Sequence, residues 1–279
     1  MFARRLPGRA LAASILALAL AGLMPGLVAA GGPVSGADVG HSSQPQPELI
    51  GYDVSYPQCA GALPGSVAFG VVGLNRGIVF SRNPCLGASD RPSQLAWAGR
   101  DAQLYANTGN PGPGLSAHWP FGQAEPRVCN ASQADTADCA YDYGWNAAQD
   151  AYATAVDAYV SLGWADAGAT RTPVANQWWL DVETANSWRD DPSLNVAALQ
   201  GAVAYLESMG VAGVGFYSAP RMWSRITADT TAFSDHPSWV AGASTLDAAE
   251  ANCIGDGFTG GGVELSQYLS GGFDANHLC

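Results

Sequence analysis

Short apolar runs alternate with longer amphipathic segments along most of this chain. The runs are nearly free of polar residues, which is typical of strands that are buried on both faces of a parallel sheet. They lie at 49–55, 67–74, 102–106, 178–183, 214–218, 239–242, 262–268 and 272–276. The pattern therefore predicts about eight strands in a sheet that is covered on both sides.

Helical periodicity marks several of the segments between these runs. In the segment 143–162, the residues that recur at helical spacing are Ala148, Tyr152, Ala155, Tyr159 and Leu162. A second helix is predicted after the central run, with Asn195 as its N-cap and Gly210 at its C-terminal end. Shorter helices are predicted at 92–100 and 220–226.

Strands that alternate with helices or long connections indicate a parallel sheet with crossovers, and eight of them favour a closed barrel. We therefore predict an α/β fold, a modified TIM (β/α) barrel that forms a single domain over 48–279. The last strands are joined by short segments, so the outer ring of helices is expected to be incomplete there. Residues 107–142 are predicted to form a long insertion, and loops of that length usually cover or build a site.

The first thirty residues have the pattern of a secretory signal. Its parts are three arginines, an apolar run and a small-residue cleavage site: Arg4, Arg5, Arg9, 10–23 and Val28-Ala29-Ala30. The apolar run is too short to span a membrane. We expect residues 1–30 to be a signal peptide and 31–47, rich in Gly, Pro, Ser and Gln, to be a flexible leader. The mature protein is then secreted or extracellular, which is compatible with association with a cell wall.

The chain has six cysteines, and all of them follow the predicted signal. An even number in a secreted chain indicates disulfides, although six cysteines allow fifteen pairings. We predict the sequential pairs Cys59–Cys85, Cys129–Cys139 and Cys253–Cys279. No Cys-x-x-Cys spacing is present, which disfavours zinc.

The chain carries a formal charge of −12, and every basic residue is Arg. Because the first thirty residues hold three of the twelve basic residues and no acidic ones, the remainder has nine basic against 24 acidic residues, or −15. Such a surface repels phosphate backbones and anionic lipid. We therefore expect no nucleic-acid partner and no membrane partner, and we expect a monomer. A neutral glycan stays possible as a partner.

Four acidic residues stand at or near the ends of apolar runs: Asp53, Asp181, Glu183 and Asp274. Active groups of such barrels lie at the C-terminal ends of the strands, so the four are expected to converge on one mouth. Mutual repulsion would then keep a proton on at least one of them, as a general acid requires. Within one strand, Asp181 and Glu183 would share a face with about 6.5 Å of backbone between them.

Paired carboxylates suit the hydrolysis of a sugar bond, in which one group gives a proton and another stabilises charge. The plain alternative is an acidic strand end that faces water, because an Asp-x-Glu triplet alone is a weak motif. Aromatic residues also stand near most strand ends: Tyr52, Tyr56, Tyr105, Trp179, Tyr217, Trp239 and Tyr268. Their faces can stack on sugar rings, but for any one of them a place in the core is the more frequent outcome.

Six short motifs occur in the order seen in family-25 glycoside hydrolases, which are lysozymes of the N-acetylmuramidase type on a modified (β/α) barrel. They are Gly51-Tyr52-Asp53-Val54-Ser55, Trp179-Leu180-Asp181-Val182-Glu183, Gly215-Phe216-Tyr217-Ser218, Trp239-Val240-Ala241, Ser266-Gln267-Tyr268 and Phe273-Asp274-Ala275-Asn276. The resemblance covers residues 49–279.

The resemblance implies a role for each matching residue. Glu183 matches the general acid, and Asp181 matches the acid that orients the substrate acetamido group or stabilises the transition state. Asp53 and Asp274 match flanking acids. Tyr217, Trp239 and Tyr268 match positions associated with the glycan groove. Trp179 and Tyr105, two further aromatic residues near strand ends, complete the substrate-binding candidates. The implied reaction is cleavage of the β-1,4 bond after N-acetylmuramic acid in peptidoglycan or a related glycan, with net retention if the acetamido group is the nucleophile.

The chain departs from the family in three runs. The second strand ends in Gly73-Leu74-Asn75-Arg76-Gly77 rather than a Lys-Ala-Thr-Glu-Gly-like run, and the third reads Leu104-Tyr105-Ala106-Asn107 rather than a Tyr-His-Phe-like run. Ser266 stands where the family has Trp. These departures leave two functions open. One is a lysozyme-type glycosidase, and the other is a non-catalytic cell-wall glycan-binding barrel that retains the carboxylates.

Two further hypotheses have less support. The four carboxylates suit Mg²⁺ or Ca²⁺, but no His-x-His or His-Glu-x-x-His motif is present. We expect neither a metal nor another cofactor. A serine hydrolase is disfavoured because the chain has no Gly-x-Ser-x-Gly elbow.

Overall fold

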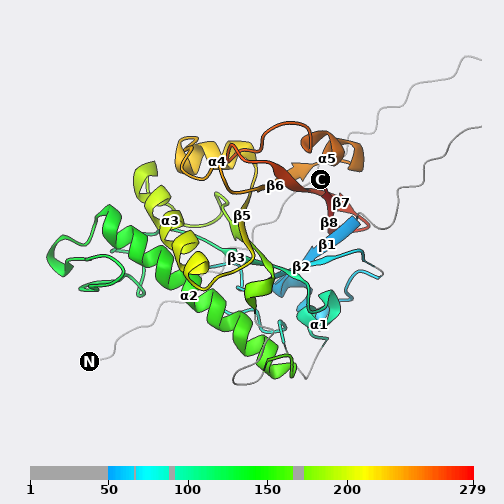
Figure 1. Cartoon of the computed structure of the whole chain (residues 1–279), viewed down its shortest axis with the longest axis horizontal. Helices are drawn as coiled ribbons and strands as arrows, with labels where there is room; N and C mark the ends of the chain where they lie inside the picture. The colour runs from blue at the N-terminus through cyan, green and yellow to red at the C-terminus, as the bar shows by residue number, and fades with distance from the viewer. Residues whose placement is uncertain (1–49, 66, 88–91, 166–172) are drawn as a thin grey trace, which may run out of the picture. The chain divides into compact units, whose positions relative to one another are not determined.

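Eight strands close into one barrel in the computed structural model, which describes residues 50–65, 67–87, 92–165 and 173–279 (Figure 1). They are β1 (Ile50–Val54), β2 (Gly70–Gly73), β3 (Gln103–Asn107), β4 (Gln177–Asp181), β5 (Gly213–Ser218), β6 (Ser238–Ala243), β7 (Val263–Ser270) and β8 (Phe273–Leu278). Each strand pairs with the next, and β8 returns to β1. The predicted closed α/β barrel is confirmed. The predicted signal peptide and leader lie outside the described residues.

The last strand runs against the others. Strands β1 to β7 pair in parallel, whereas β8 is antiparallel to both β7 and β1. The expectation of parallel crossovers is therefore wrong at this point. Only Gly271 and Gly272 separate β7 from β8, and a parallel crossover needs about a dozen residues or more. Both glycines have positive φ, +60° and +85°, which a tight hairpin turn requires.

This reversal changes the position of one predicted site residue. Asp274 was expected at the C-terminal end of a strand, but it is the second residue of β8. Because β8 is antiparallel, its start lies at the end of the barrel where β1 to β7 finish. Asp274 stands in register with Asp53 there.

The helices are α1 (Gln94–Ala98), α2 (Ala137–Ser161), α3 (Pro192–Ser208), α4 (Pro220–Thr227) and α5 (Leu246–Asn252). Short 3₁₀ turns lie at Tyr56–Ala60, Ala131–Gln133 and Pro173–Ala175. Helix α2 begins earlier than predicted because Thr136 caps it, accepting a hydrogen bond from the backbone N–H of Cys139. Helix α3 begins at Pro192 with Asp191 as its N-cap, so Asn195 is not the cap.

The ring of helices is incomplete, as predicted. No helix stands between β7 and β8, and the described residues between β1 and β2 form only a 3₁₀ turn. Within the described residues, no helix combines the length and the apolar character needed to cross a membrane.

Two apolar layers result from the alternation of side chains along the strands. On β4, Trp178 and Leu180 face the surrounding helices, whereas Trp179 faces the barrel interior. The interior layer is made of Val71, Trp179, Trp239 and Leu265, all at most 1% exposed. This layer fills the barrel beneath its mouth, and the acids Asp53, Asp181 and Asp274 lie above it.

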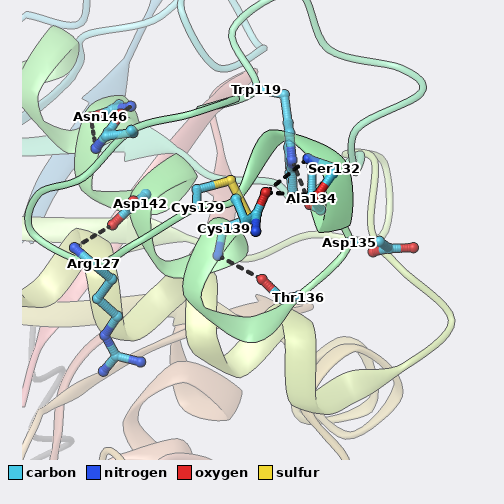
Figure 2. Close-up of a disulfide and its surroundings, with 12 residues drawn as sticks. Trp119, Arg127, Cys129, Ser132, Ala134, Asp135, Thr136, Cys139, Asp142 and Asn146 are labelled. Carbon is cyan, nitrogen blue, oxygen red and sulfur yellow. Dashed lines mark hydrogen bonds between the residues drawn. A yellow bond between two sulfur atoms is a disulfide. The ribbon is translucent and has the colours of Figure 1, made fainter.

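The three predicted disulfides, Cys59–Cys85, Cys129–Cys139 and Cys253–Cys279, are all present. Figure 2 shows how the second one joins the long insertion to the first turn of α2. Beside it, the indole Nε1 of Trp119 donates to the carbonyl of Ala134 at 2.8 Å. The insertion is therefore anchored to the barrel.

Candidate active site

Four acids line one cavity at the mouth of the barrel. Asp53, Asp181, Glu183 and Asp274 surround a volume of about 270 Å³, together with Tyr105, Tyr217, Trp239 and Gln267. The structure thus brings together the four carboxyl groups that the sequence singled out. Asp53 comes from β1, Asp181 ends β4, and Asp274 is the second residue of β8.

Asp53 is buried at the back of this cavity, with 8% of its surface exposed. Its Oδ2 accepts hydrogen bonds from Nε2 of Gln267 at 3.0 Å and from Nδ2 of Asn276 at 2.7 Å. Burial, together with the charge of Asp274, raises the pKa of Asp53 to about 7, although the two hydrogen bonds oppose that rise. A buried carboxyl group with a pKa near 7 is partly charged at neutral pH. That buried charge lowers the free energy of unfolding of the protein.

We expect Asp53→Asn to stabilise the protein at pH 8. The folded-state pKa of Asp53 exceeds its unfolded value, so its contribution to stability is present below pH 4 and is lost as the pH rises towards 7. The amide oxygen of Asn can accept both hydrogen bonds without a charge. The gain in unfolding free energy should be on the order of 3 kcal/mol at pH 8 and should shrink towards pH 4.

Urea unfolding at several pH values measures this difference. The exposed Asp247, changed to Asn, is the control and should show no such pH-dependent gain. A D53N gain that is equal at pH 4 and pH 8 would contradict the assignment of a raised pKa.

The carboxyl groups of Asp181 and Glu183 lie side by side at this cavity and interact directly. Asp181 is 3% exposed, and Nδ2 of Asn107 donates a short hydrogen bond to its Oδ2. Burial, followed by the charges of Glu183 and Asp53, raises the pKa of Asp181 well above its usual value. Burial also raises the pKa of Glu183, and its contact with the Asp181 carboxyl group opposes that rise. Burial and the neighbouring charge of Glu183 thus both favour the protonated form of Asp181.

Strand β4 ends at Asp181, so Glu183 lies beyond the strand instead of within it as predicted. The backbone around Glu183 is nevertheless fixed. Nε1 of Trp188 donates to the carbonyl of Glu183 at 2.8 Å, and the hydroxyl of Ser218 donates to the carbonyl of Val182 at 2.7 Å. These contacts hold the acid pair at the cavity.

A polar network joins the remaining groups of the cavity. The hydroxyl of Tyr217 donates to Oε1 of Gln267 at 2.8 Å, and Nε1 of Trp239 donates to Oδ1 of Asn276 at 2.7 Å. Gln267 and Asn276 in turn donate to Asp53. Tyr217 and Trp239 thus orient the amide groups of Gln267 and Asn276, which donate hydrogen bonds to Asp53.

Among the aromatic candidates, Tyr105, Tyr217 and Trp239 line the cavity, but Trp179 and Tyr268 do not. Trp179 lies in the fully buried interior layer, where its Nε1 donates to Oε1 of Gln103 at 2.6 Å. Tyr268 packs against Ala249 and Ala275 outside the barrel. The alternation along β7 explains this difference, because it turns Gln267 inward and its neighbour Tyr268 outward.

Sequence reasoning assigned no role to Asn107, Gln267 or Asn276. All three donate directly to the acids. The alternation of side chains along a strand would have indicated Asn276. It lies two residues after Asp274 on the same strand and therefore on the same face.

In the part of the chain that the structure describes, no group of three or more His, Cys, Asp or Glu side chains is placed to hold a metal ion. What the fold and the cavity define is a (β/α) barrel with a protonatable acid pair at the carboxyl ends of its strands.

Comparisons with known proteins agree with the motifs. The family model described as Lysozyme-like protein 1 matches residues 165–252. The chain is 38% identical over 63 residues to "Probable GH family 25 lysozyme 4" of Dictyostelium discoideum, a match that spans 23% of this chain and 29% of the relative. Both matches support the resemblance to family-25 lysozymes or a divergent relative of that family.

Three solved structures have a similar fold. The muramidase from Trichobolus zukalii has a TM-score of 0.48 and 14% identity, and the match covers 83% of this chain and 93% of the muramidase. The bacterial lysozyme from Streptomyces coelicolor has a TM-score of 0.45 and 14% identity, and the match covers 82% of this chain and 91% of the lysozyme. The modular autolysin LytC from Streptococcus pneumoniae has a TM-score of 0.49 and 14% identity, and the match covers 82% of this chain and 46% of LytC.

Proposed function

We propose that this protein is a secreted, lysozyme-type glycoside hydrolase that cleaves the β-1,4 bond after N-acetylmuramic acid in peptidoglycan. The observation that carries the proposal is the adjacent pair Asp181 and Glu183, both with raised pKa values, at a cavity lined by two further acids. A protonated carboxyl group beside a carboxylate supplies both the acid and the charge stabilisation that glycoside hydrolysis needs. The matches to lysozyme-like proteins support the same choice of substrate.

Glu183 is the general acid in this proposal. It is the less buried member of the pair and lines the cavity, so its proton has access to the oxygen of the scissile bond. When Glu183 gives this proton, the bond between the anomeric carbon and the leaving oxygen breaks. Positive charge then develops on the sugar ring, and the carboxylates of the cavity stabilise it.

Asp181 receives the acetamido group of the substrate. An amide N–H donated to Asp181 favours its carboxylate form, and the proton of Asp181 then moves to Glu183. The acetamido oxygen attacks the anomeric carbon as the leaving group departs. Water later attacks the same carbon, the bond between that carbon and the acetamido oxygen breaks, and the water gives its proton to Glu183. This step restores the acid and the acetamido group and retains the anomeric configuration.

The close contact within the pair favours this route over simple inversion. An inverting enzyme needs its two carboxyl groups about 6.5–9.5 Å apart, so that a water fits between them. The carboxyl groups of Asp181 and Glu183 instead interact directly. The three disulfides favour an oxidising, extracellular location.

The direct test compares wild-type protein with the double variant D181N/E183Q on purified, insoluble peptidoglycan. We expect the wild type to release soluble fragments and the double variant to release none, while both sediment with the peptidoglycan. A non-catalytic glycan-binding barrel would give sedimentation without release for both. Equal release by both proteins would contradict the assignment of the acid pair.

A further inference from the structure

A second groove opens at the same end of the barrel as the acid cavity, and its volume is about 350 Å³. Three loops build it: 78–80 after β2, 109–118 after β3 and 185–187 after β4. All three follow the carboxyl ends of parallel strands, where the acids also lie. The middle wall comes from the disulfide-anchored insertion.

The chain runs directly from the acid pair into this groove. Asn107 donates to the carboxylate of Asp181, and both the N–H and the hydroxyl of Thr108 donate to its carbonyl, at 3.1 and 2.5 Å. Gly109, the next residue, lines the groove. On the other wall, the N–H of Asn186 donates to the carbonyl of Glu183 at 3.1 Å. Two separate segments of the chain, 107–109 and 183–186, therefore lead from the acid cavity to the groove, although the two share no lining residue.

The groove combines apolar side chains with neutral polar ones such as Ser116, Asn186 and Ser187. Its lining exposes two aliphatic side chains, Ile78 at 63% and Leu115 at 82%. The rings of Phe80 and His118 stack with their centroids 4.2 Å apart. No Asp, Glu or Arg is among the described residues that line it, although the whole chain is strongly acidic. Such a surface fits a ligand without charge.

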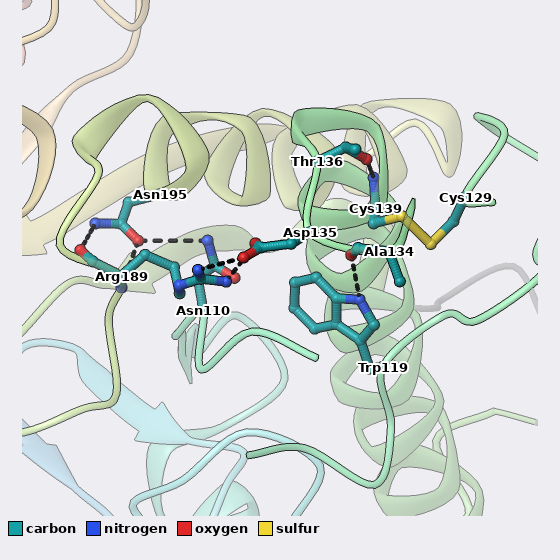
Figure 3. A network of polar contacts seen from close by, with 9 residues as sticks. All are labelled: Asn110, Trp119, Cys129, Ala134, Asp135, Thr136, Cys139, Arg189 and Asn195. Carbon is teal, nitrogen blue, oxygen red and sulfur yellow. Dashed lines mark hydrogen bonds and ion pairs between the residues drawn. A yellow bond between two sulfur atoms is a disulfide. The ribbon is translucent and has the colours of Figure 1, made fainter. Parts of the chain in front are cut away.

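The walls are held in place before any ligand binds. The N–H of Asn110 donates to the carbonyl of Ser187 at 2.7 Å. Arg189 makes two contacts to Asp135 of the insertion, at 2.6 and 2.8 Å, and Asn195 joins the backbone of Arg189 to the side chain of Asn110 (Figure 3). A groove whose walls are fixed in this way loses little entropy when it binds.

We infer that this groove is a subsite for a neutral, N-acetylated stretch of the glycan beyond the bond that is cleaved; the inference rests on the proposed function. Acetyl methyl groups fit against Ile78 and Leu115. The polar residues Ser116, Asn186 and Ser187 also line the groove and supply hydrogen-bonding groups for an acetyl carbonyl or a sugar hydroxyl. A peptide stem is a poorer fit, since its free carboxylates find no cation here.

Calorimetry in the Glu183→Gln background tests the inference without turnover. The probes are the dimer and the hexamer of β-1,4-linked N-acetylglucosamine. We expect the hexamer to bind at least about tenfold more tightly than the dimer. The variant I78S/L115S should lose about tenfold in hexamer affinity and keep its dimer affinity, since the added serines remove apolar contact area only in the groove. The matched control V160S/I254S changes two exposed aliphatic residues elsewhere and should bind both probes normally.

An unchanged hexamer affinity in I78S/L115S, or no preference for the hexamer, would overturn the inference. So would an effect of I78S/L115S that is confined to peptide-bearing fragments. Release of fragments from peptidoglycan by wild-type protein is measured in parallel. If release is normal and the groove variant binds normally, only the subsite is rejected. If the wild type releases nothing, the proposed function fails.

Discussion

Glu183→Gln should reduce kcat on peptidoglycan by about 10²–10⁴-fold, the usual contribution of a general acid. Gln has nearly the same shape as Glu but has no proton to give, so binding of the glycan should be retained. The change also removes a charge next to Asp181, whose raised pKa depends in part on Glu183. Initial rates of fragment release at saturating substrate measure the effect.

The matched control for this prediction is Glu250→Gln, an exposed residue of α5. It should keep its activity within about twofold, as expected for an exposed residue far from the reacting groups. A Glu183→Gln variant with the activity of wild type would mean that another group delivers the proton.

Gly144→Ala should destabilise the fold strongly, although helix propensity predicts the opposite sign. Alanine in a helix interior normally stabilises by about 1 kcal/mol relative to glycine. Here a Cβ on Gly144 of α2 would stand 1.7 Å from the carbonyl oxygen of Ala198 in α3. Gly201 of α3 approaches α2 equally closely, with 1.9 Å to the carbonyl oxygen of Tyr141. The helices would have to move apart, at a cost on the order of 3 kcal/mol.

Urea unfolding of the oxidised protein measures this loss. Gly61→Ala is the control, because an added Cβ there meets nothing within 4 Å and the backbone is extended at φ −107°. It should be neutral within about 0.5 kcal/mol. Equal or greater stability of G144A would mean that α2 and α3 do not pack at this crossing.

The order of apolar runs was enough to predict the barrel, because strands buried on both faces need little beyond apolar residues. The inward direction of Asp181 also followed from alternation, since Trp179 and Asp181 lie on the same face of β4. The same rule, applied to β7, places Gln267 rather than Tyr268 in the cavity. The prediction placed Tyr268 in the cavity because it is aromatic and did not consider on which face of β7 it lies.

Other features depend on contacts between distant residues. Asp135 and Arg189, which join the insertion to the loop after Glu183, are 54 positions apart, and no local pattern connects them. The hairpin that reverses β8 had a local signal in Gly271 and Gly272, which the expectation of parallel strands obscured. Asn is a common N-cap residue, which is why Asn195 was predicted to cap α3. Asp191 followed by Pro192 is the stronger signal for the start of that helix.

The most direct test of the account identifies the new reducing end that the protein creates. Fragments released from purified peptidoglycan are reduced with borohydride, hydrolysed to single sugars and analysed by mass spectrometry. The account predicts reduced N-acetylmuramic acid in the wild-type digest and its absence with Glu183→Gln. Reduced N-acetylglucosamine as the new end, or the same product with the variant, would contradict it.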